Sequence, residues 1–375
     1  MGLLLIVLGL VLFVCLVLVH EYGHYKAARR NGVEVEEFGL GFPPKVWGKR
    51  QKSGMLLSLN LLPLGGFVRL KGEHDADNEP GSYGAAPLSA KVKIMSAGVI
   101  MNLLTALIMF LLLAWIGMPQ LVENQFTVAS DSSVAKQQVL VGYVEPDSPA
   151  AKAGIEQRDV LVAVGPSGQE AQPITDINTF PELTQGLAGQ TIDLVIEHNG
   201  EKVTKTIQLR STDEVEASQA TDQPKGYLGL APTEYVVKRS TWSAPIVAVG
   251  TAGQFTWLTL KGLGSVVTSI FRGDTSTAAA QVSGPVGIFV LIKDGSLLGI
   301  QFVLLIVAVI SLTLAIMNSL PIPALDGGRL FVTLLFRALK KPLTPKIEDT
   351  IHGIGFALLI GLFVLITVVD VRRFF

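Results

Sequence analysis

Four stretches of the chain are long enough and apolar enough to cross a lipid bilayer as helices: residues 2–24, 94–118, 297–320 and 353–369. A spanning helix needs roughly 20 mostly apolar residues, and a helix satisfies all its backbone hydrogen bonds internally, as lipid requires. The mean hydropathy of +0.48 agrees with this pattern. The sequence therefore predicts a polytopic α-helical membrane protein with four transmembrane helices and polar insertions.

Charge and cysteine content exclude several other classes of protein. The net charge of −1 indicates no general affinity for nucleic acid. The single cysteine, Cys15, lies in the first apolar stretch, so the chain cannot form an internal disulfide, and we expect no cysteine-based zinc site. No Lys or Arg precedes His20 and no small-residue cleavage site follows it, so we expect this stretch to be retained rather than removed as a signal peptide.

Basic residues predict the orientation of the chain in the membrane. Residues 25–93 hold eleven Lys and Arg residues, and the segment 326–350 holds a second basic group. Loops rich in Lys and Arg stay on the cytoplasmic side. We therefore expect both termini and the long insert 119–296 to lie outside the cytoplasm.

The insert contains a polar region, residues 125–233, with the pattern of a small α+β domain and a hairpin turn at Asn199-Gly200. Residues 148–155 (Ser-Pro-Ala-Ala-Lys-Ala-Gly-Ile) resemble a PDZ domain in the circularly permuted bacterial order, in which the Tyr-Leu-Gly-Leu segment at 227–230 comes last. One such domain is visible. We expect residues 234–296 to form amphipathic linker helices on the outer surface.

The first apolar stretch ends in a His-Glu-x-x-His sequence. His20 and His24 are four residues apart, so on a helix they lie on one face and can bind one Zn²⁺. Glu21 between them can take a proton from a water on that metal. Ionisable residues within a membrane segment are costly and mark functional sites.

The third apolar stretch ends in a second polar group. Asn318, Pro321, Pro323 and Asp326 follow one another among apolar residues, and the prolines end the helix. The first and third stretches both run toward the cytoplasm, so Asp326 reaches the depth of the two histidines. Two His and one carboxylate leave a fourth zinc position open, as in catalytic zinc sites. We expect His74, His198 and His352 not to be ligands.

Residues 34–71 of the basic loop are unusually apolar. The segments 38–44 and 55–70 are Gly-rich and predict a β-hairpin. Such a hairpin can enter the protein at membrane depth if it is covered or lines a cavity. A surface hairpin packed on the helix ends is the alternative.

Together these motifs resemble the site-2 protease family of intramembrane zinc metalloproteases, in particular its RseP-like bacterial branch. The resemblance rests on the His-Glu-x-x-His at 20–24, the Asn-x-x-Pro-x-Pro-x-Leu-Asp-Gly at 318–327, the Leu-Leu-Pro-Leu-Gly-Gly-Phe-Val at 61–68 and the Ala-Gly pair at 97–98 with Asn102. It covers nearly the whole chain. Two departures are Pro43, where Gly is common in the family, and Val99, where Pro is common.

The resemblance implies His20, His24 and Asp326 as ligands of one Zn²⁺ per chain, Glu21 as general base and Asn318 as a donor to the substrate carbonyl or oxyanion. It further implies five substrate-binding residues: Gly65, Gly66, Asn102, Pro321 and Pro323. The implied activity is cleavage of single-span membrane proteins, of the anti-sigma-factor or signal-peptide-remnant type, in the bacterial inner membrane.

The expected organisation is a membrane core at 1–118, a PDZ domain at 125–233, linker helices at 234–296 and a second membrane core at 297–375. Two other functions compete with the protease. A membrane-anchored PDZ scaffold with a vestigial site would be favoured by loss of Glu21 or Asp326, and both are present. A metal transporter would be expected to carry ionisable residues in several spans, and the second and fourth stretches have none. The PDZ groove could bind a peptide or could block bulky proteins, and the sequence leaves both open.

Overall fold

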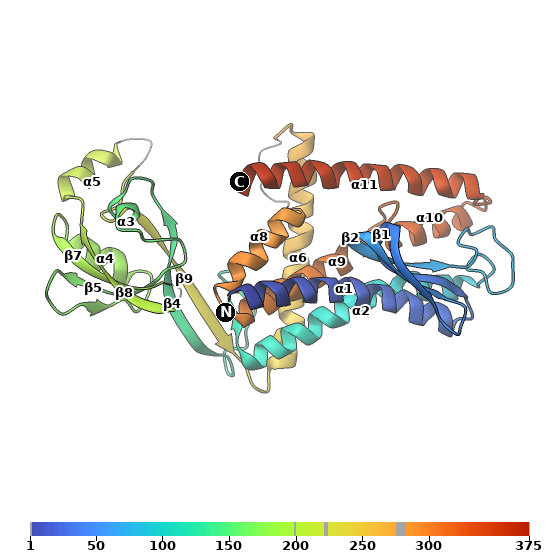
Figure 1. Cartoon of the computed structure of the whole chain (residues 1–375), viewed down its shortest axis with the longest axis horizontal. Coiled ribbons are helices and arrows are strands. Elements are labelled where there is room, and N and C mark those ends of the chain that lie inside the picture. The colour runs from blue at the N-terminus through green and yellow to red at the C-terminus, as the bar shows by residue number, and fades with distance from the viewer. Residues whose placement is uncertain (1, 199, 221–223, 275–282, 375) are drawn as a thin grey trace. The chain divides into compact units, whose positions relative to one another are not determined.

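The computed structural model describes residues 2–198, 200–220, 224–274 and 283–374 (Figure 1). The chain forms two compact units. The first comprises Met1–Leu113 and Ala244–Phe375, and the second comprises Ala114–Ser243. The predicted turn at Asn199-Gly200 lies partly outside the described residues.

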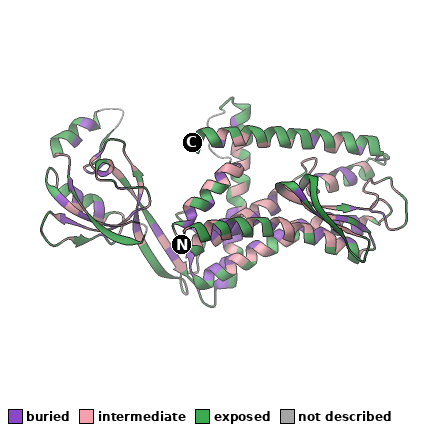
Figure 2. Cartoon of the chain, viewed as in Figure 1, coloured by how far each residue is buried: buried purple, intermediate pink, exposed green. Residues whose placement is uncertain are grey.

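Four of the described helices are long and apolar enough to cross a membrane: α1 (Gly2–Arg30), α2 (Leu88–Ile116), α9 (Ile300–Ser319) and α11 (Pro345–Phe374). Each predicted stretch overlaps one of them, and α1 and α11 continue into polar sequence. Half of the most apolar window of α9 is buried, against 11% in α1 and α11. Helix α9 is therefore the central span. Figure 2 shows exposed residues along much of α1 and α11, whose sequences are largely apolar.

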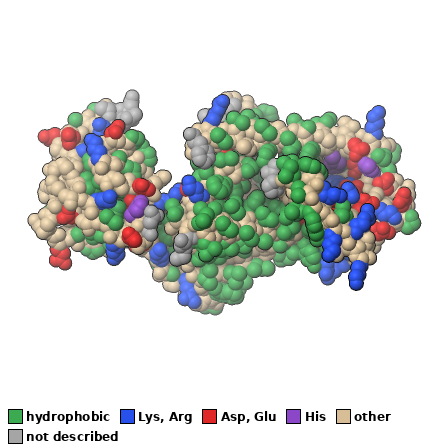
Figure 3. Space-filling view, viewed as in Figure 1, with side chains coloured by type: hydrophobic (Ala, Val, Ile, Leu, Met, Phe, Trp, Pro, Cys, Tyr) green, Lys and Arg blue, Asp and Glu red, His purple; other side chains and the backbone are tan. Residues whose placement is uncertain are grey.

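The described part of the first unit also contains three shorter or less apolar helices: α6 (Ala244–Phe271), α8 (Pro285–Ser296) and α10 (Asp326–Ala338). Helices α1, α6, α8 and α10 all pack against α9. Phe110 of α2 stacks on Phe255 of α6, with ring centroids 6.1 Å apart. Figure 3 shows a broad hydrophobic surface over this unit, with charged side chains gathered at the end that holds the β-hairpin and α10.

The β-hairpin consists of β1 (Val35–Arg50) and β2 (Leu56–Leu70). Both strands bend, so residues 35–40 pair with 66–70 on one side and with 56–59 on the other, and residues 45–50 pair with 56–60. The hairpin packs against α1. A Cβ at Gly66 would lie 3.1 Å from the Cγ of Glu21, so glycine permits this close approach to the His-Glu-x-x-His segment.

The second unit is built on a seven-stranded sheet with the order β3-β9-β4-β5-β7-β8, and β6 pairs with β5. The strands are β3 (Met118–Pro119), β4 (Ser133–Val144), β5 (Val160–Pro166), β6 (Gln172–Pro173), β7 (Thr191–His198), β8 (Glu201–Gln208) and β9 (Leu230–Arg239). Helices α3 (Pro149–Lys152), α4 (Thr179–Gly186) and α5 (Thr212–Gln219) accompany it. The last strand, β9, lies between β3 and β4. It runs to Arg239, past the boundary at 233 that the sequence suggested.

Candidate metal centre

Three side chains from opposite ends of the sequence converge in the first unit. His20 and His24 lie one turn apart on α1, and Asp326 is the first residue of α10. The Asp326 Oδ2 lies 3.1 Å from the Nε2 of each histidine, and the two Nε2 atoms lie 3.2 Å apart. These three are the one group of described His, Cys, Asp and Glu residues whose ligand atoms could together hold a metal ion.

The donor set and its spacing fit zinc. Bonds of about 2.0–2.1 Å in a tetrahedral site place neighbouring ligand atoms about 3.3 Å apart. The three observed separations of 3.1–3.2 Å are close to that edge length. Two imidazoles and one carboxylate also leave one tetrahedral position for water or substrate.

The Nδ1 atoms of both imidazoles, which point away from the proposed metal position, have hydrogen-bond partners. The Nδ1 of His24 lies 2.8 Å from the Ile94 carbonyl oxygen, which can only accept, so Nδ1 donates and Nε2 is left with its lone pair for a metal. The Nδ1 of His20 lies 3.2 Å from the side-chain nitrogen of Asn102. Asn102 is buried, and its side-chain oxygen has no hydrogen-bond partner among the described residues.

Small residues make room for the imidazole pair. A Cβ at Gly98 would lie 2.3 Å from the Nε2 of His24, and a Cβ at Gly23 would lie 2.7 Å from the Ala97 carbonyl. Only glycine permits α1 and α2 to approach this closely. Sequence reasoning assigned Gly98 no role, although its position four residues before Asn102 on one helix face was the available signal.

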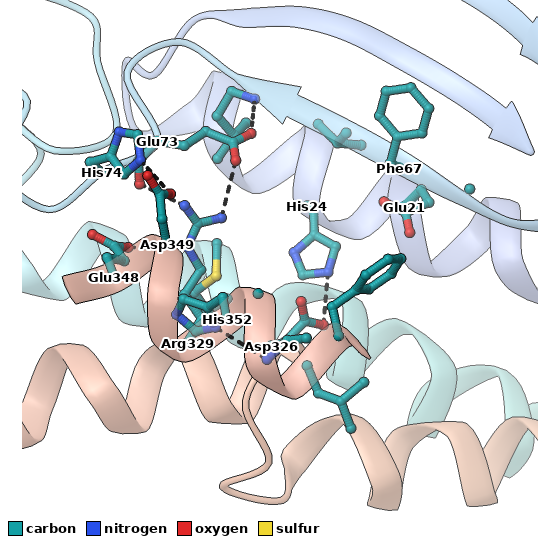
Figure 4. A pocket seen from close by; sticks show the side chains of 18 residues that line it. Glu21, His24, Phe67, Glu73, His74, Asp326, Arg329, Glu348, Asp349 and His352 are labelled. Carbon is teal, nitrogen blue, oxygen red and sulfur yellow. Dashed lines mark hydrogen bonds and ion pairs between the residues drawn. The ribbon is translucent and has the colours of Figure 1, made fainter. Parts of the chain in front are cut away.

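A cavity of about 650 Å³ adjoins the centre and is lined by Glu21, His24, Asp326 and residues 66–68 of β2. Figure 4 shows His24 pointing toward Asp326, with Glu21 beside it on the same helix. Gly66, a predicted substrate-binding residue, lines this cavity. Gly65 instead lines a smaller pocket of about 80 Å³ with Val17 and Asn60.

The opposite wall of the cavity is polar. Arg329 donates from Nη2 to the Glu73 carbonyl oxygen at 2.6 Å (Figure 4). Its guanidinium also lies 5.2 Å from the ring centre of Tyr83. Burial raises the pKa of Tyr83 to about 12. His74 contacts Asp349 at 2.9 Å, a hydrogen bond that raises the pKa of the imidazole.

Three other predicted residues, Asn318, Pro321 and Pro323, lie in or beside the loop between α9 and α10. The Asn318 amide donates to the Leu314 carbonyl four residues earlier in α9, at 3.1 Å. Pro321 and Pro323 form the loop that leads to Asp326. Asn102 lies behind His20 rather than in this loop.

The profile of Peptidase family M50 matches residues 8–362, and the chain belongs to this family. A predicted zinc metalloprotease of Clostridium perfringens is 31% identical over 98% of both chains. Zinc metalloprotease RasP of Geobacillus kaustophilus is 27% identical over 98% of this chain and 97% of its own. Regulator of sigma-E protease RseP of Escherichia coli is 25% identical over 92% of this chain and 93% of its own. The protein is therefore a zinc metalloprotease with membrane-spanning helices.

Proposed function

We propose that this protein hydrolyses peptide bonds within the transmembrane segments of single-span membrane proteins. In this proposal His20, His24 and Asp326 hold the zinc ion and Glu21 is the general base. The convergence of three ligand atoms at 3.1–3.2 Å, on the helices that would lie in or beside the bilayer, carries the proposal.

In the proposed hydrolysis, Glu21 and Asn318 have different roles. Zinc, when bound, polarises the scissile carbonyl and makes water acidic enough to attack near neutral pH. Glu21 takes the proton of that water and passes it to the leaving amine. Asn318 would donate to the developing oxyanion after its amide leaves the Leu314 carbonyl.

The substrate must unwind, because a transmembrane helix hides its peptide bonds in its own hydrogen bonds. Residues 66–70 pair with β1 on one side, and residues 66–68 line the cavity, so this edge can add a substrate strand beside Glu21. Val68→Pro should lower turnover while leaving the zinc content unchanged. Unchanged turnover would contradict strand addition.

The relatives suggest a substrate class and a location. The name of the Escherichia coli relative links that protein to the regulation of a sigma factor. We extend this to the present chain as regulated intramembrane proteolysis of an anti-sigma factor or a signal-peptide remnant. The positive-inside pattern supports a bacterial inner-membrane location with the second unit and both termini outside and the centre near the cytoplasmic side.

We propose that residues 125–233, within the second unit, form a PDZ domain. The side chain of Ser148 caps α3 by accepting from the Ala151 N–H at 3.1 Å, and the 227–230 segment leads directly into β9. The last strand of the unit, β9, lies between β3 and β4, which agrees with a permuted order. The unit would bind a peptide or exclude bulky proteins.

One comparison tests the protease directly. Wild-type protein and Glu21→Gln are purified in detergent, their zinc content is measured, and both are given a single-span substrate. We expect equal zinc in both and cleavage by the wild type alone. Equal cleavage would refute the role of Glu21, and zinc without cleavage in the wild type would favour the vestigial scaffold.

A further inference from the structure

Helix α11 contacts the loop that carries Asp326 through a histidine. The Nδ1 of His352 accepts a hydrogen bond from the backbone N–H of Ala324 at 3.1 Å. Ala324 has φ +75°, a left-handed conformation that residues other than glycine rarely adopt. Such a conformation persists only where the surrounding structure holds it. The hydrogen bond that Ala324 donates to His352 is one of the contacts that hold it.

The same helix packs on the loop one turn further along. A Cβ at Gly355 would lie 2.5 Å from the Cβ of Pro323 and 2.7 Å from its carbonyl oxygen. On the other side of the loop, a Cβ at Gly328 would lie 1.8 Å from the carbonyl oxygen of Ile322. Residues 321–325 are therefore packed closely between the first turn of α10 and the N-terminal turns of α11.

The second ring nitrogen of His352 is not held by a hydrogen bond within the described part of the chain. His352 lines the cavity, and its Nε2 is buried with no hydrogen-bond partner among the described residues (Figure 4). Because Nδ1 accepts from Ala324, a neutral ring carries its proton on Nε2. Among the described residues, the bond from Ala324 is therefore the one hydrogen bond that orients the ring.

We infer that His352 is a positioning residue for the metal centre: it holds residues 321–325 in the conformation that presents Asp326 to the two histidines. The inference rests on the proposed role of Asp326 as a ligand. According to this inference, α11 affects zinc affinity although it supplies no proposed ligand. Helix α11 is also, with α1, the least buried of the four spans. A contact that orients a ligand typically changes metal affinity by about 10–100-fold.

Four variants test this inference in the full-length protein in detergent. His352→Leu removes the acceptor, and His352→Asn keeps an acceptor near the position of Nδ1. Gly355→Ala places a methyl group against Pro323, and Gly361→Ala, in the same helix with open space around it, is the matched control. Zinc affinity is measured by competition with a chelator, and hydrogen exchange of the Ile322, Ala324 and Leu325 amides is measured in metal-free protein.

We expect His352→Leu and Gly355→Ala to weaken zinc binding about tenfold or more and to speed exchange at Ala324 without metal. His352→Asn should restore most of the affinity, and Gly361→Ala should match the wild type. Wild-type affinity and exchange in His352→Leu would overturn the inference. Asp326→Ala in the same titration separates the two proposals, since undiminished zinc binding there would refute the ligand role itself.

Discussion

At the scale of single residues, the buried amide of Asn102 bears directly on the metal centre. When the Nε2 of His20 faces a metal, its Nδ1 carries the proton and must donate. An amide turned by 180° presents its oxygen to that nitrogen, and the oxygen and nitrogen of an amide are nearly indistinguishable by shape. This orientation also gives the unpartnered Asn102 oxygen a donor. In this orientation Asn102 would be the partner that orients His20.

We therefore predict that Asn102→Leu lowers zinc affinity by about 10–100-fold, because His20 loses its acceptor. Asn102→Asp, which keeps an acceptor oxygen, should retain most of the affinity. Chelator competition on the purified variants measures both. Thr105→Val, one turn along α2, removes a hydroxyl that donates to the Met101 carbonyl of the same helix and serves as the control. Full zinc affinity in Asn102→Leu would show that the amide has another role.

At the scale of secondary-structure elements, a carboxylate of α11 caps another helix. Asp370 is fully buried, and its Oδ2 accepts from the N–H groups of Gly284 and Gly287 at 2.8 Å each. The first N–H groups of a helix lack partners within it, so this carboxylate completes the start of α8. The two ends of α11 are thus anchored by polar contacts, through His352 at its start and Asp370 at its end.

Replacement of Asp370 by Ala should destabilise the first unit, because two buried N–H groups lose their acceptor. A loss of about 1–3 kcal/mol is expected for each buried group left unsatisfied. Thermal unfolding in detergent should show a lower Tm for Asp370→Ala and little change for Val371→Ala, whose side chain is exposed. Equal Tm values for the two variants would mean that water replaces the carboxylate without cost.

The second unit contains a carboxyl group, that of Asp131, whose contribution to the stability of the folded state depends on pH. Partial removal from water raises the pKa of Asp131, but hydrogen bonds from the backbone and hydroxyl groups of Ser243 and Thr241 lower it more, so the pKa lies below its ordinary value of 3.8. A carboxyl with a lowered pKa stabilises the folded state above its unfolded pKa, and this stabilisation is lost as the pH falls through the folded value.

Asp131→Asn should accordingly lower the Tm of the second unit at pH 7. The difference in Tm between wild type and variant should narrow as the pH is taken below about 4, since the wild-type carboxyl then becomes protonated. Thermal unfolding across this pH range measures the difference. A difference that stays constant down to the lowest pH would show that the charge of Asp131 contributes nothing.

At the scale of the whole molecule, the metal centre joins residues 302 positions apart in the sequence. A ligand that binds only the folded state stabilises it by about 2.7 kcal/mol at a concentration one hundred times its Kd. Removal of zinc with a chelator should lower the Tm of the first unit in the wild type and in Glu21→Gln alike. His24→Ala should show no shift on chelation. A chelator shift that persists in His24→Ala would place the stabilising zinc elsewhere.

Much of the membrane unit could be predicted because its determinants are local. An uncharged run of about 20 residues has to be helical in lipid, so the four spans follow from hydropathy alone. The relation of His20 to His24 follows from helical spacing, which places residues four apart on one face. Asp326 could be placed near the two histidines because the first and third spans run in the same direction, which brings the ends of both spans to the same depth in the membrane.

The contacts around the centre could not be predicted, because they depend on how separate helices pack. Nothing near Asn102 in the sequence indicates that its amide lies against His20, and nothing near His352 indicates that its ring accepts from Ala324. The sequence by itself determined which segments span the membrane and which side chains share a helix face, since both follow from the period of the helix and the chemistry of lipid. The tertiary structure alone decided which side chains orient the imidazoles and hold the Asp326 loop, since these partners meet only when α1, α2, α10 and α11 are packed together.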